Sequence, residues 1–396
     1  MKRWPTKPLG ELCDVRIGRT PRRDEPRFWG GDAVWVSIRE LNGGEITSSK
    51  EMLSEAAVCE CMPEPIPTGT LLFSFKLSIG KMAIAGCPLY TNEAIAALPI
   101  RKPAELSRDF LRYALLRESH EGTANTAVMG KVLNKEKVQQ LQIPVPLLAE
   151  QERIVKLLDE ADELRKLRAQ ADRRSADLIP ALFHEMFGDP MAGTGNWERK
   201  TFGDLLERID GGWSPTCHDR PAQPEEWGVL KLGAVTACQY LDTETKALPE
   251  NFAPRPDLEV KVGDLLFTRK NTYELVAACA FVFETRPKLM LSDLIFRFRL
   301  KPGVELNPIF LWGLLTVPSK RKQVQALAGG SAGSMPNISK GRLMMLPIEV
   351  PPLPLQKQFA QSVSEIRALQ AAQAASRKRT EHLFQSMLHR AFAQAL

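Results

Sequence analysis

The feature that most constrains the fold of this 396-residue chain is an internal repeat with a period of about 190–205 residues. The segment that begins at Lys7 aligns with the segment that begins at Lys200, and the segment at Gly69 aligns with that at Gly263. The offset rises slowly along the chain while the order of the aligned blocks stays the same, as small loop insertions would produce. Because a repeat of this length encodes one supersecondary unit twice, we predict two copies of a single fold.

Single residues extend the repeat. Gly18 aligns with Gly211 at an offset of 193, and Gln151 aligns with Gln356 at an offset of 205. The end of each copy is marked by a similar block, 133–146 in the first copy and 338–351 in the second.

Each copy begins with short strand-like runs separated by turns. The runs are 33–38, 71–75 and 95–100 in the first copy, and 228–232, 265–268 and 294–300 in the second. In the last run two phenylalanines alternate with Arg297 and Arg299, a pattern that predicts a half-buried strand. Helices are expected at 107–118 and 308–317, so each copy is of the α/β (α+β) class.

A proline-rich stop and a long helical segment close each copy. We expect one helix from about 148 to 187, with a kink or an end at Pro180, and a second within 351–396 that is preceded by Pro351, Pro352 and Pro354. A helix of roughly 35–40 residues is about 55 Å long, so we expect the two apolar stripes to bury each other, as in a coiled coil. The alternative is that each helix packs on its own globular copy. The residues predicted to pack are Ile154, Leu157, Ala161, Leu164, Leu178, Phe359, Val363, Ile366, Leu369 and Leu383.

The block from Leu141 to Ile154 resembles the stretch that opens the helical spacer of type I restriction–modification specificity subunits. The second copy of this block is similar but has Leu355 where the first copy has Glu150. The starts of both copies, the segment at Gly69 and the segment at Gly329 also resemble that family, and the resemblance covers essentially the whole chain.

The resemblance implies a non-catalytic protein in which each copy is a target-recognition domain that reads one half of a split site in double-stranded DNA. The long helices would form an antiparallel coiled coil that sets the spacing and docks two methyltransferase subunits, which restriction and translocase subunits would join. The implied domains are 1–145, the central spacer 146–190, 191–350 and the C-terminal spacer 351–396. This chain would hold no cofactor, and S-adenosylmethionine, ATP and Mg would belong to the partner subunits.

Candidate DNA contacts are the polar and basic side chains of the loops, because base edges and phosphates are read by such groups. In the first copy they are Arg19, Thr20, Arg22, Arg23, Lys76, Lys81 and Lys131. In the second copy they are Trp213, His218, Arg220, Arg269, Lys270, Ser331, Ser334 and Asn337. A solvated surface residue or a turn residue is the alternative for each of them.

Composition and motifs weigh against other classes of protein. The net charge of +6 favours a polyanionic partner only mildly. The seven cysteines lack zinc-site spacing, no metal site is expected, and no run is long and apolar enough to cross a membrane, so we expect a cytoplasmic protein. Asn307-Pro308-Ile309-Phe310 is a poor match to an adenine methyltransferase motif, and the segment 257–261 only imitates part of a nuclease site. A non-catalytic scaffold that bridges two partner proteins remains the other open interpretation.

Overall fold

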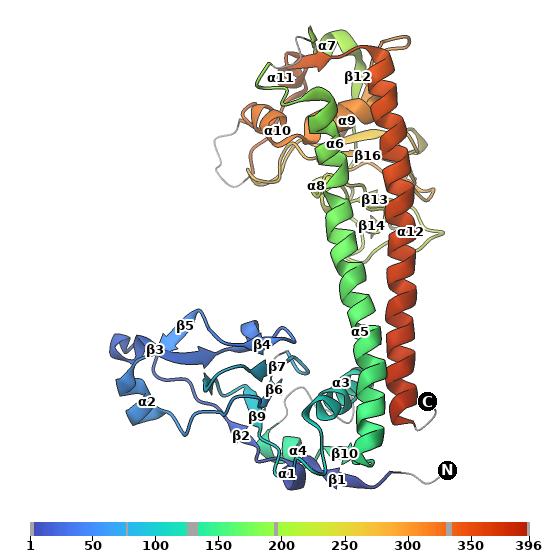
Figure 1. Cartoon of the computed structure of the whole chain (residues 1–396). Coiled ribbons are helices and arrows are strands. Elements are labelled where there is room, and N and C mark those ends of the chain that lie inside the picture. Colours follow the sequence, from blue (N-terminus) through green and yellow to red (C-terminus); the bar gives the residue numbers. More distant parts are fainter. Residues whose placement is uncertain (1–3, 77, 125–133, 194–196, 330–334, 394–396) are drawn as a thin grey trace. The chain divides into compact units, whose positions relative to one another are not determined.

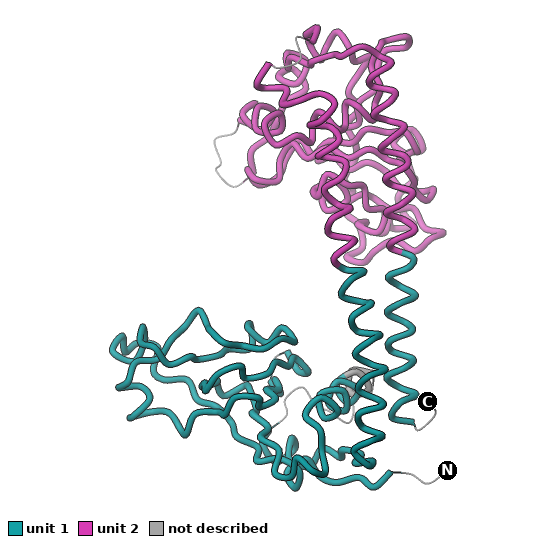
Figure 2. The backbone as a smooth tube through the Cα atoms, in the orientation of Figure 1, with its two compact units in different colours: residues 1–169, 375–396 teal, residues 170–374 magenta. Residues whose placement is uncertain are grey.

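The computed structural model describes residues 4–76, 78–124, 134–193, 197–329 and 335–393. The chain forms two compact units, residues 1–169 with 375–396 (unit 1) and residues 170–374 (unit 2) (Figure 2). Each unit contains a part of both long helices, so the helices are shared between the units.

Unit 1 is built on a five-stranded sheet of order β2-β9-β6-β7-β4, beside a three-stranded sheet β5-β3-β8 and the pair β1-β10 (Figure 1). The strands are β1 Thr6–Pro8, β2 Arg16–Ile17, β3 Trp29–Val36, β4 Glu45–Ile46, β5 Glu51–Leu53, β6 Leu71–Ser74, β7 Met82–Ala85, β8 Tyr90–Thr91, β9 Ile95–Leu98 and β10 Gln142–Pro144. The helices are α1 Leu9–Leu12, α2 Glu55–Cys61, α3 Arg108–Ala124 and α4 Lys135–Gln139, with 3-10 turns at Pro26–Phe28 and Ile38–Glu40.

Unit 2 repeats most of this topology, with sheets of order β12-β18-β15-β16 and β14-β13-β17 and the pair β11-β19, and β4 of unit 1 has no counterpart among its described strands. Its strands are β11 Glu198–Thr201, β12 Leu206–Gly211, β13 Gly228–Leu230, β14 Thr245–Ala247, β15 Leu265–Thr268, β16 Cys279–Phe281, β17 Leu289–Met290, β18 Ile295–Leu300 and β19 Pro347–Val350. Its helices are α7 Phe202–Leu205, α8 Gly233–Thr236, α9 Pro308–Thr316, α10 Pro318–Gln325 and α11 Lys340–Met344, with a 3-10 turn at Pro256–Leu258. Both units therefore mix helices and strands as an α+β fold, and each predicted strand-like run contains a strand.

The aligned glutamines hold the same position in both copies. The amide of Gln151 accepts a hydrogen bond from the Ser107 N–H at 2.8 Å and donates to two backbone carbonyls. The amide of Gln356 accepts from the Asn307 N–H at 2.7 Å and also donates to two carbonyls. Both side chains are fully buried, so each glutamine ties the start of a long helix to the segment before α3 or α9.

Replacing Gln356 with leucine should lower the free energy of unfolding of unit 2 by about 1–3 kcal/mol, because the Asn307 N–H and two carbonyls would stay buried without partners. Gln361→Leu is the matched control, since Gln361 is exposed on the same helix and its amide donates to Glu365, one turn further along. Denaturant unfolding compares the two variants. Equal stability of both would contradict this role for Gln356.

The first long helical segment is divided near its end. Helix α5 spans Leu148–Ala176 and α6 spans Leu178–Phe187, whereas α12 runs without a break over Leu353–Phe392. The ring of Pro180 conflicts with the carbonyl four residues earlier, which is that of Ala176, so the helix ends there as the sequence predicts. Prolines in the first turn, such as Pro354 of α12, interrupt no helical hydrogen bond.

The long helices pack both on each other and on their own unit, which combines the two alternatives drawn from the sequence. In unit 1, Ile154 and Leu158 of α5 share a core with Phe384 of α12 and Phe110 of α3. In unit 2 a second core joins side chains of α6, α9 and α12, namely Phe183, Phe187, Phe310 and Phe359. Direct contacts between the paired helices include the Arg165–Glu381 ion pair at 2.8 Å in unit 1 and the Ser175–Gln373 hydrogen bond at 2.7 Å in unit 2.

This mixed packing corrects part of the predicted stripe. Among the predicted residues, Ile154, Ala161, Phe359 and Val363 are buried, and Leu157 and Ile366 are partly buried. The prediction is wrong for Leu164, Leu178, Leu369 and Leu383, which are 40–56% exposed. Because α3 and α9 cover one side of the long helices, the buried face is rotated toward Leu158, Phe183, Phe384 and Leu388, which are at most 2% exposed.

A buried ionic network ties three parts of unit 2 together. Arg297 on β18 is 2% exposed and donates to Asp210 of β12 at 2.9 Å and to Asp264 at 3.1 Å. It also donates to the carbonyls of Asp257 and Glu259. Burial alone would raise the pKa of Asp210, but hydrogen bonds from arginines, Arg297 among them, hold this pKa below its usual value. Strand β18 thus lies where the alternation of phenylalanine and arginine predicts it, while Arg297 is buried among charged partners.

Candidate nucleic-acid interface

Four of the predicted contacts of unit 1 gather at one end of its main sheet. Strands β2 and β6 both run antiparallel to β9, and Ile17 and Phe73 both face Ala96. Chain segments that leave these two strands therefore emerge at the same end of the sheet. They carry Arg19 and Thr20 after β2 and Lys76 after β6, and Lys81 immediately precedes β7 at this end.

Carboxylates hold most of the polar side chains of this first loop. The Thr20 hydroxyl donates to Glu93, and this hydrogen bond lowers the pKa of the Glu93 carboxyl group. Arg22 pairs with Asp24 at 3.1 Å, and Arg23 forms an ion pair with Glu51. Thr20, Arg22 and Arg23 are exposed, so a polyanion could displace these carboxylates without unfolding the loop.

Four of the predicted contacts of unit 2 lie at the equivalent end of its main sheet. Strands β12 and β15 run antiparallel to β18, with Gly211 and Phe267 both opposite Phe296. Trp213 follows the first of these strands, and Arg269 and Lys270 follow the second. Asn337 lies beside Lys270 through an isolated β-bridge, so its loop reaches the same end.

The remaining predicted contacts lie elsewhere or are not described. His218 and Arg220 lie alongside strand β14, where the backbone N–H of His218 donates to the Ala247 carbonyl and the backbone N–H of Ala247 donates to the Arg220 carbonyl. Arg220 is held by a two-pronged ion pair with Glu226, with distances of 2.7 and 2.8 Å. The structure thus places His218 and Arg220 beside the smaller sheet. Lys131, Ser331 and Ser334 lie outside the described residues.

The structure corrects one pair of residues that the sequence repeat aligned. A Cβ atom added at Gly18 would lie 2.0 Å from the Thr91 carbonyl oxygen, and one added at Gly212 would lie 2.3 Å from the Leu291 carbonyl oxygen. A Cβ at Gly211 would meet nothing closer than 4.0 Å. The structural counterpart of Gly18 is therefore Gly212, and the pairing with Gly211 is wrong by one residue because β12 contains one extra residue at the register shift between Leu206 and Arg208.

The same correction reveals paired contacts that sequence reasoning missed. Beside Gly212, the Ser214 hydroxyl bonds to Asp293, just as Thr20 bonds to Glu93 in the first copy. Each hydroxyl–carboxylate pair ties the loop after β2 or β12 to the turn before β9 or β18. Four different residue types perform this one task, so the alignment contained no identity that could reveal it.

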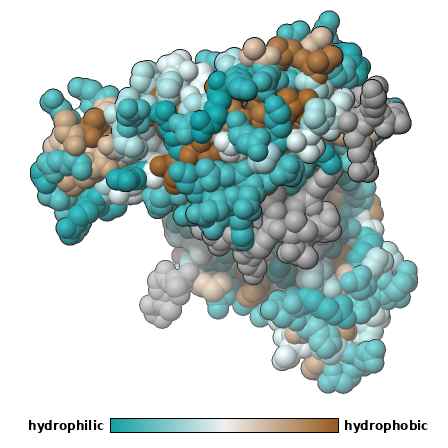
Figure 3. Space-filling view, turned by 90° about the horizontal axis from the view of Figure 1, so that it is seen from below, coloured by the Kyte–Doolittle hydropathy of each residue, from teal (hydrophilic) through white to brown (hydrophobic). Residues whose placement is uncertain are grey.

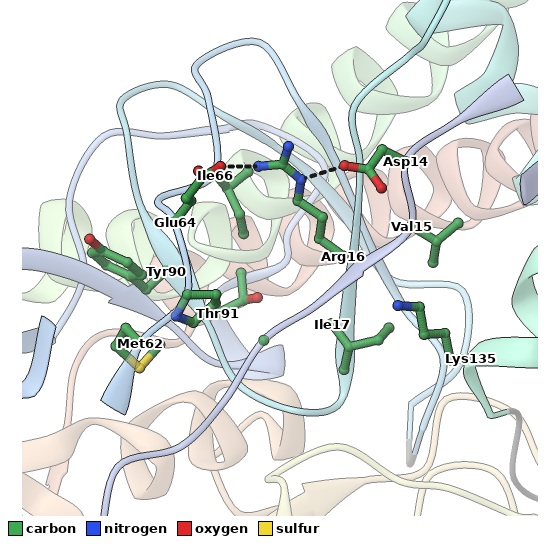
Figure 4. A pocket seen from close by; sticks show the side chains of 12 residues that line it. Asp14, Val15, Arg16, Ile17, Met62, Glu64, Ile66, Tyr90, Thr91 and Lys135 are labelled. Carbon is green, nitrogen blue, oxygen red and sulfur yellow. Dashed lines mark hydrogen bonds and ion pairs between the residues drawn. The ribbon is translucent and has the colours of Figure 1, made fainter. Parts of the chain in front are cut away.

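A cavity of about 410 Å³ in unit 1 opens beside β2 (Figure 4). Its lining includes Arg16, which pairs with Asp14 at 2.7 Å and with Glu64 at 3.6 Å. The hydroxyl of Thr91 lines the cavity and is buried without a hydrogen-bond partner among the described residues. The charged groups Arg16, Asp14 and Glu64 pair with one another, and their mixed charges favour no particular ligand.

Other kinds of site find no support in the part of the chain that the structure describes. No cluster of three or more His, Cys, Asp or Glu side chains there could hold a metal ion. No described helix is long and apolar enough to cross a membrane. The segment 257–261, which imitates a nuclease motif, instead presents carbonyls to Arg297. Figure 3 shows a face on which hydrophilic residues predominate and hydrophobic residues form separate patches.

Comparison with known proteins identifies one family model and several relatives. Residues 1–172 match the family described as type I restriction modification DNA specificity domain. The chain is 35% identical over 170 residues to the type I restriction enzyme EcoEI specificity subunit of Escherichia coli, covering 43% of this chain and 28% of that protein. It is 27% identical over 240 residues to the MjaIX specificity subunit of Methanocaldococcus jannaschii, covering 54% of each. The chain thus spans about half or less of these relatives.

The fold has neighbours that extend over the whole chain. A chain from a structure on complex assembly and conformational transition of the type I R-M system gives a TM-score of 0.64 at 19% identity, covering 100% of this chain and 99% of that one. The type I restriction-modification S subunit from M. genitalium gives a TM-score of 0.54 at 13% identity, covering 98% and 96%. At such identities the likeness concerns the fold. Residues 1–172 thus match the DNA specificity domain of type I restriction–modification systems and resemble specificity subunits in sequence, and the chain as a whole is similar in fold to the S subunit from M. genitalium.

Proposed function

We propose that this chain is the non-catalytic DNA-recognition subunit of a type I restriction–modification complex and that each unit reads one half of a split target. The observation that carries the proposal is the duplicated sheet topology combined with unlike loops at equivalent sheet ends. Two identical readers would suit a palindrome, whereas two unlike readers suit an asymmetric site.

The charges at the two sheet ends support DNA as the ligand. Arg19, Lys76 and Lys270 carry cationic groups at the ends where the loops emerge, and Arg22 and Arg23 follow in the next stretch of unit 1. Because several of these cations are already paired with carboxylates, DNA phosphates must compete with intramolecular partners. We therefore expect the protein alone to bind DNA weakly and with strong salt dependence.

The long helices give the proposal its spacing element. In this reading α5, α6 and α12 form an antiparallel coiled coil that fixes the distance between the half-sites and offers docking surfaces to two methyltransferase subunits. The exposed leucines of the helices, such as Leu164 and Leu383, suit such contacts. Restriction and translocase subunits would join through these partners, with S-adenosylmethionine, ATP and Mg bound outside this chain.

The decisive experiment is to co-express the chain with its methyltransferase subunit in a host without adenine methylation and to map modified adenines in the genome. The expected result is one split motif with two defined halves around a fixed run of unspecified bases. Replacing residues 1–140 with those of a relative that has another target should change one half of the motif and leave the other intact.

A soluble complex that modifies no adenine would contradict the proposal. The alternative, a scaffold that bridges two partner proteins without reading DNA, predicts this outcome. A gel-shift titration with random-sequence DNA then separates a scaffold from a reader that binds DNA without methylation.

A further inference from the structure

Unit 1 presents an arginine stacked on indole rings beside the turn at Gly18. The guanidinium carbon of Arg23 lies 4.3 Å from the ring centre of Trp29 and 4.9 Å from that of Trp35. The indole N–H of Trp35 donates to the carbonyl of Arg19 at 3.0 Å, which fixes this ring to the loop after β2.

Unit 2 contains the same combination of side chains at the corresponding turn. The guanidinium carbon of Arg255 lies 4.2 Å from the ring centre of Trp213, and Trp213 packs edge-on against Phe252. The backbone N–H of Trp213 donates to the Leu291 carbonyl, just as the backbone N–H of Arg19 donates to the Thr91 carbonyl. Residue 213 is therefore the counterpart of residue 19, and the two stacks adjoin the same turn.

The two stacks come from positions that are not equivalent in the repeat. Trp35 of β3 faces Tyr90, and its counterpart Val229 of β13 faces Met290. Val229 is a smaller side chain, and the indole of Trp213 packs against the cluster that contains it. An arginine on an indole thus occurs in both copies although duplication of the same residues cannot account for it, which suggests a shared task.

The two arginines differ in what else they contact. Arg23 is held by Glu51, which faces Trp35 across β3 and β5. The corresponding partner of Val229 is Lys246, which cannot accept from an arginine and pairs with Asp219 at 3.0 Å. Within the described ranges the exposed guanidinium of Arg255 has no carboxylate partner, so its edge is open while its plane is fixed by stacking.

We propose that Arg255 reads a guanine in the half-site contacted by unit 2, with Trp213 as the platform that orients it. An arginine edge that donates to O6 and N7 of guanine is the commonest specific contact in the major groove, and stacking removes freedom that binding would otherwise have to remove. This inference rests on the proposed function and adds a base-reading residue to it.

The test compares Arg255→Gln, Arg255→Lys and Arg23→Gln in the assembled methyltransferase complex, using DNA duplexes that vary one base pair at a time in each half of the wild-type motif. For Arg255→Gln we expect modification of the cognate duplex to fall roughly 10- to 100-fold, with discrimination lost at one G·C pair of the second half. Arg255→Lys should keep the charge but not the discrimination, because an ammonium group lacks the planar pair of donors. Arg23→Gln should leave preferences in the second half unchanged.

The wild-type complex separates failure of this inference from failure of the proposed function. If the wild type reads a split motif and Arg255→Gln modifies it with unchanged rate and preferences, Arg255 does not read a base. A uniform loss on all duplexes, with a weaker salt dependence, would assign Arg255 to a phosphate and would also overturn the inference. Thermal unfolding of each variant verifies that the exposed substitution leaves the fold intact.

Discussion

Replacing Arg297 with methionine should lower the free energy of unfolding of unit 2 by about 3–5 kcal/mol, the cost of leaving a buried charge without its partner. Asp264, which is 4% exposed, would lose its buried donor, and Asp210 would lose one of its partners. The carbonyls of Asp257 and Glu259 would lose theirs as well, so the segment before β15 would no longer be tied to β18.

Arg299→Met is the matched control for this prediction. Arg299 bonds to the same two carboxylates, Asp210 at 3.1 Å and Asp264 at 3.0 Å, but its side chain is 34% exposed and water can replace it. Hydrogen exchange measured by mass spectrometry resolves both units, and peptides of unit 1 serve as the internal reference. Loss of protection in unit 2 that is equal for the two variants would mean that burial of Arg297 adds nothing.

Patterns that depend on neighbouring residues predict much of this fold. Periodicity locates the strands, and Pro180 locates the break between α5 and α6, because a proline acts on the helix that contains it. The repeat predicts the duplicated topology, because the order of the aligned blocks can be read from the sequence without knowing any contacts. The buried face of the long helices cannot be predicted in this way, because it depends on packing against α3 and α9. The helical pattern alone is compatible with burial of either Leu157 or Leu158.

The candidate interface is predictable in its location and not in its partners. Sequence reasoning selects Arg19, Thr20 and Lys76 because loops after strands carry polar residues, and the sheet then brings them to one end. It misses Arg255, since nothing near this arginine in the chain indicates that Trp213 lies beneath it. It also does not predict that Arg297 is buried, because the carboxylates that allow this burial lie on other segments of the chain.

Gly212→Ala should disable the second reader while Gly211→Ala leaves it working. The added Cβ at Gly212 would lie 2.3 Å from the carbonyl oxygens of both Leu291 and Ser292, and backbone cannot move aside as the end of a side chain can. The turn must therefore shift, at a cost of about 1–3 kcal/mol or more, and Trp213 must move with it because its N–H bonds to Leu291. We expect modification of the cognate DNA to fall roughly 10- to 100-fold, as loss of one or two base contacts would produce.

The neighbouring residue Gly211 provides a matched control for this prediction. Gly211→Ala changes the same kind of residue one position earlier, where the nearest atom, Nζ of Lys340, lies 4.0 Å from the new Cβ. Gly18→Ala should act in the first half of the motif as Gly212→Ala acts in the second, because its Cβ would meet the Thr91 carbonyl oxygen at 2.0 Å. Mapping modified adenines for the three variants assigns each turn to one half-site. If Gly211→Ala were the damaging change instead, the offset of 193 residues from Gly18 would be the correct register and the structural pairing of the two turns would be wrong.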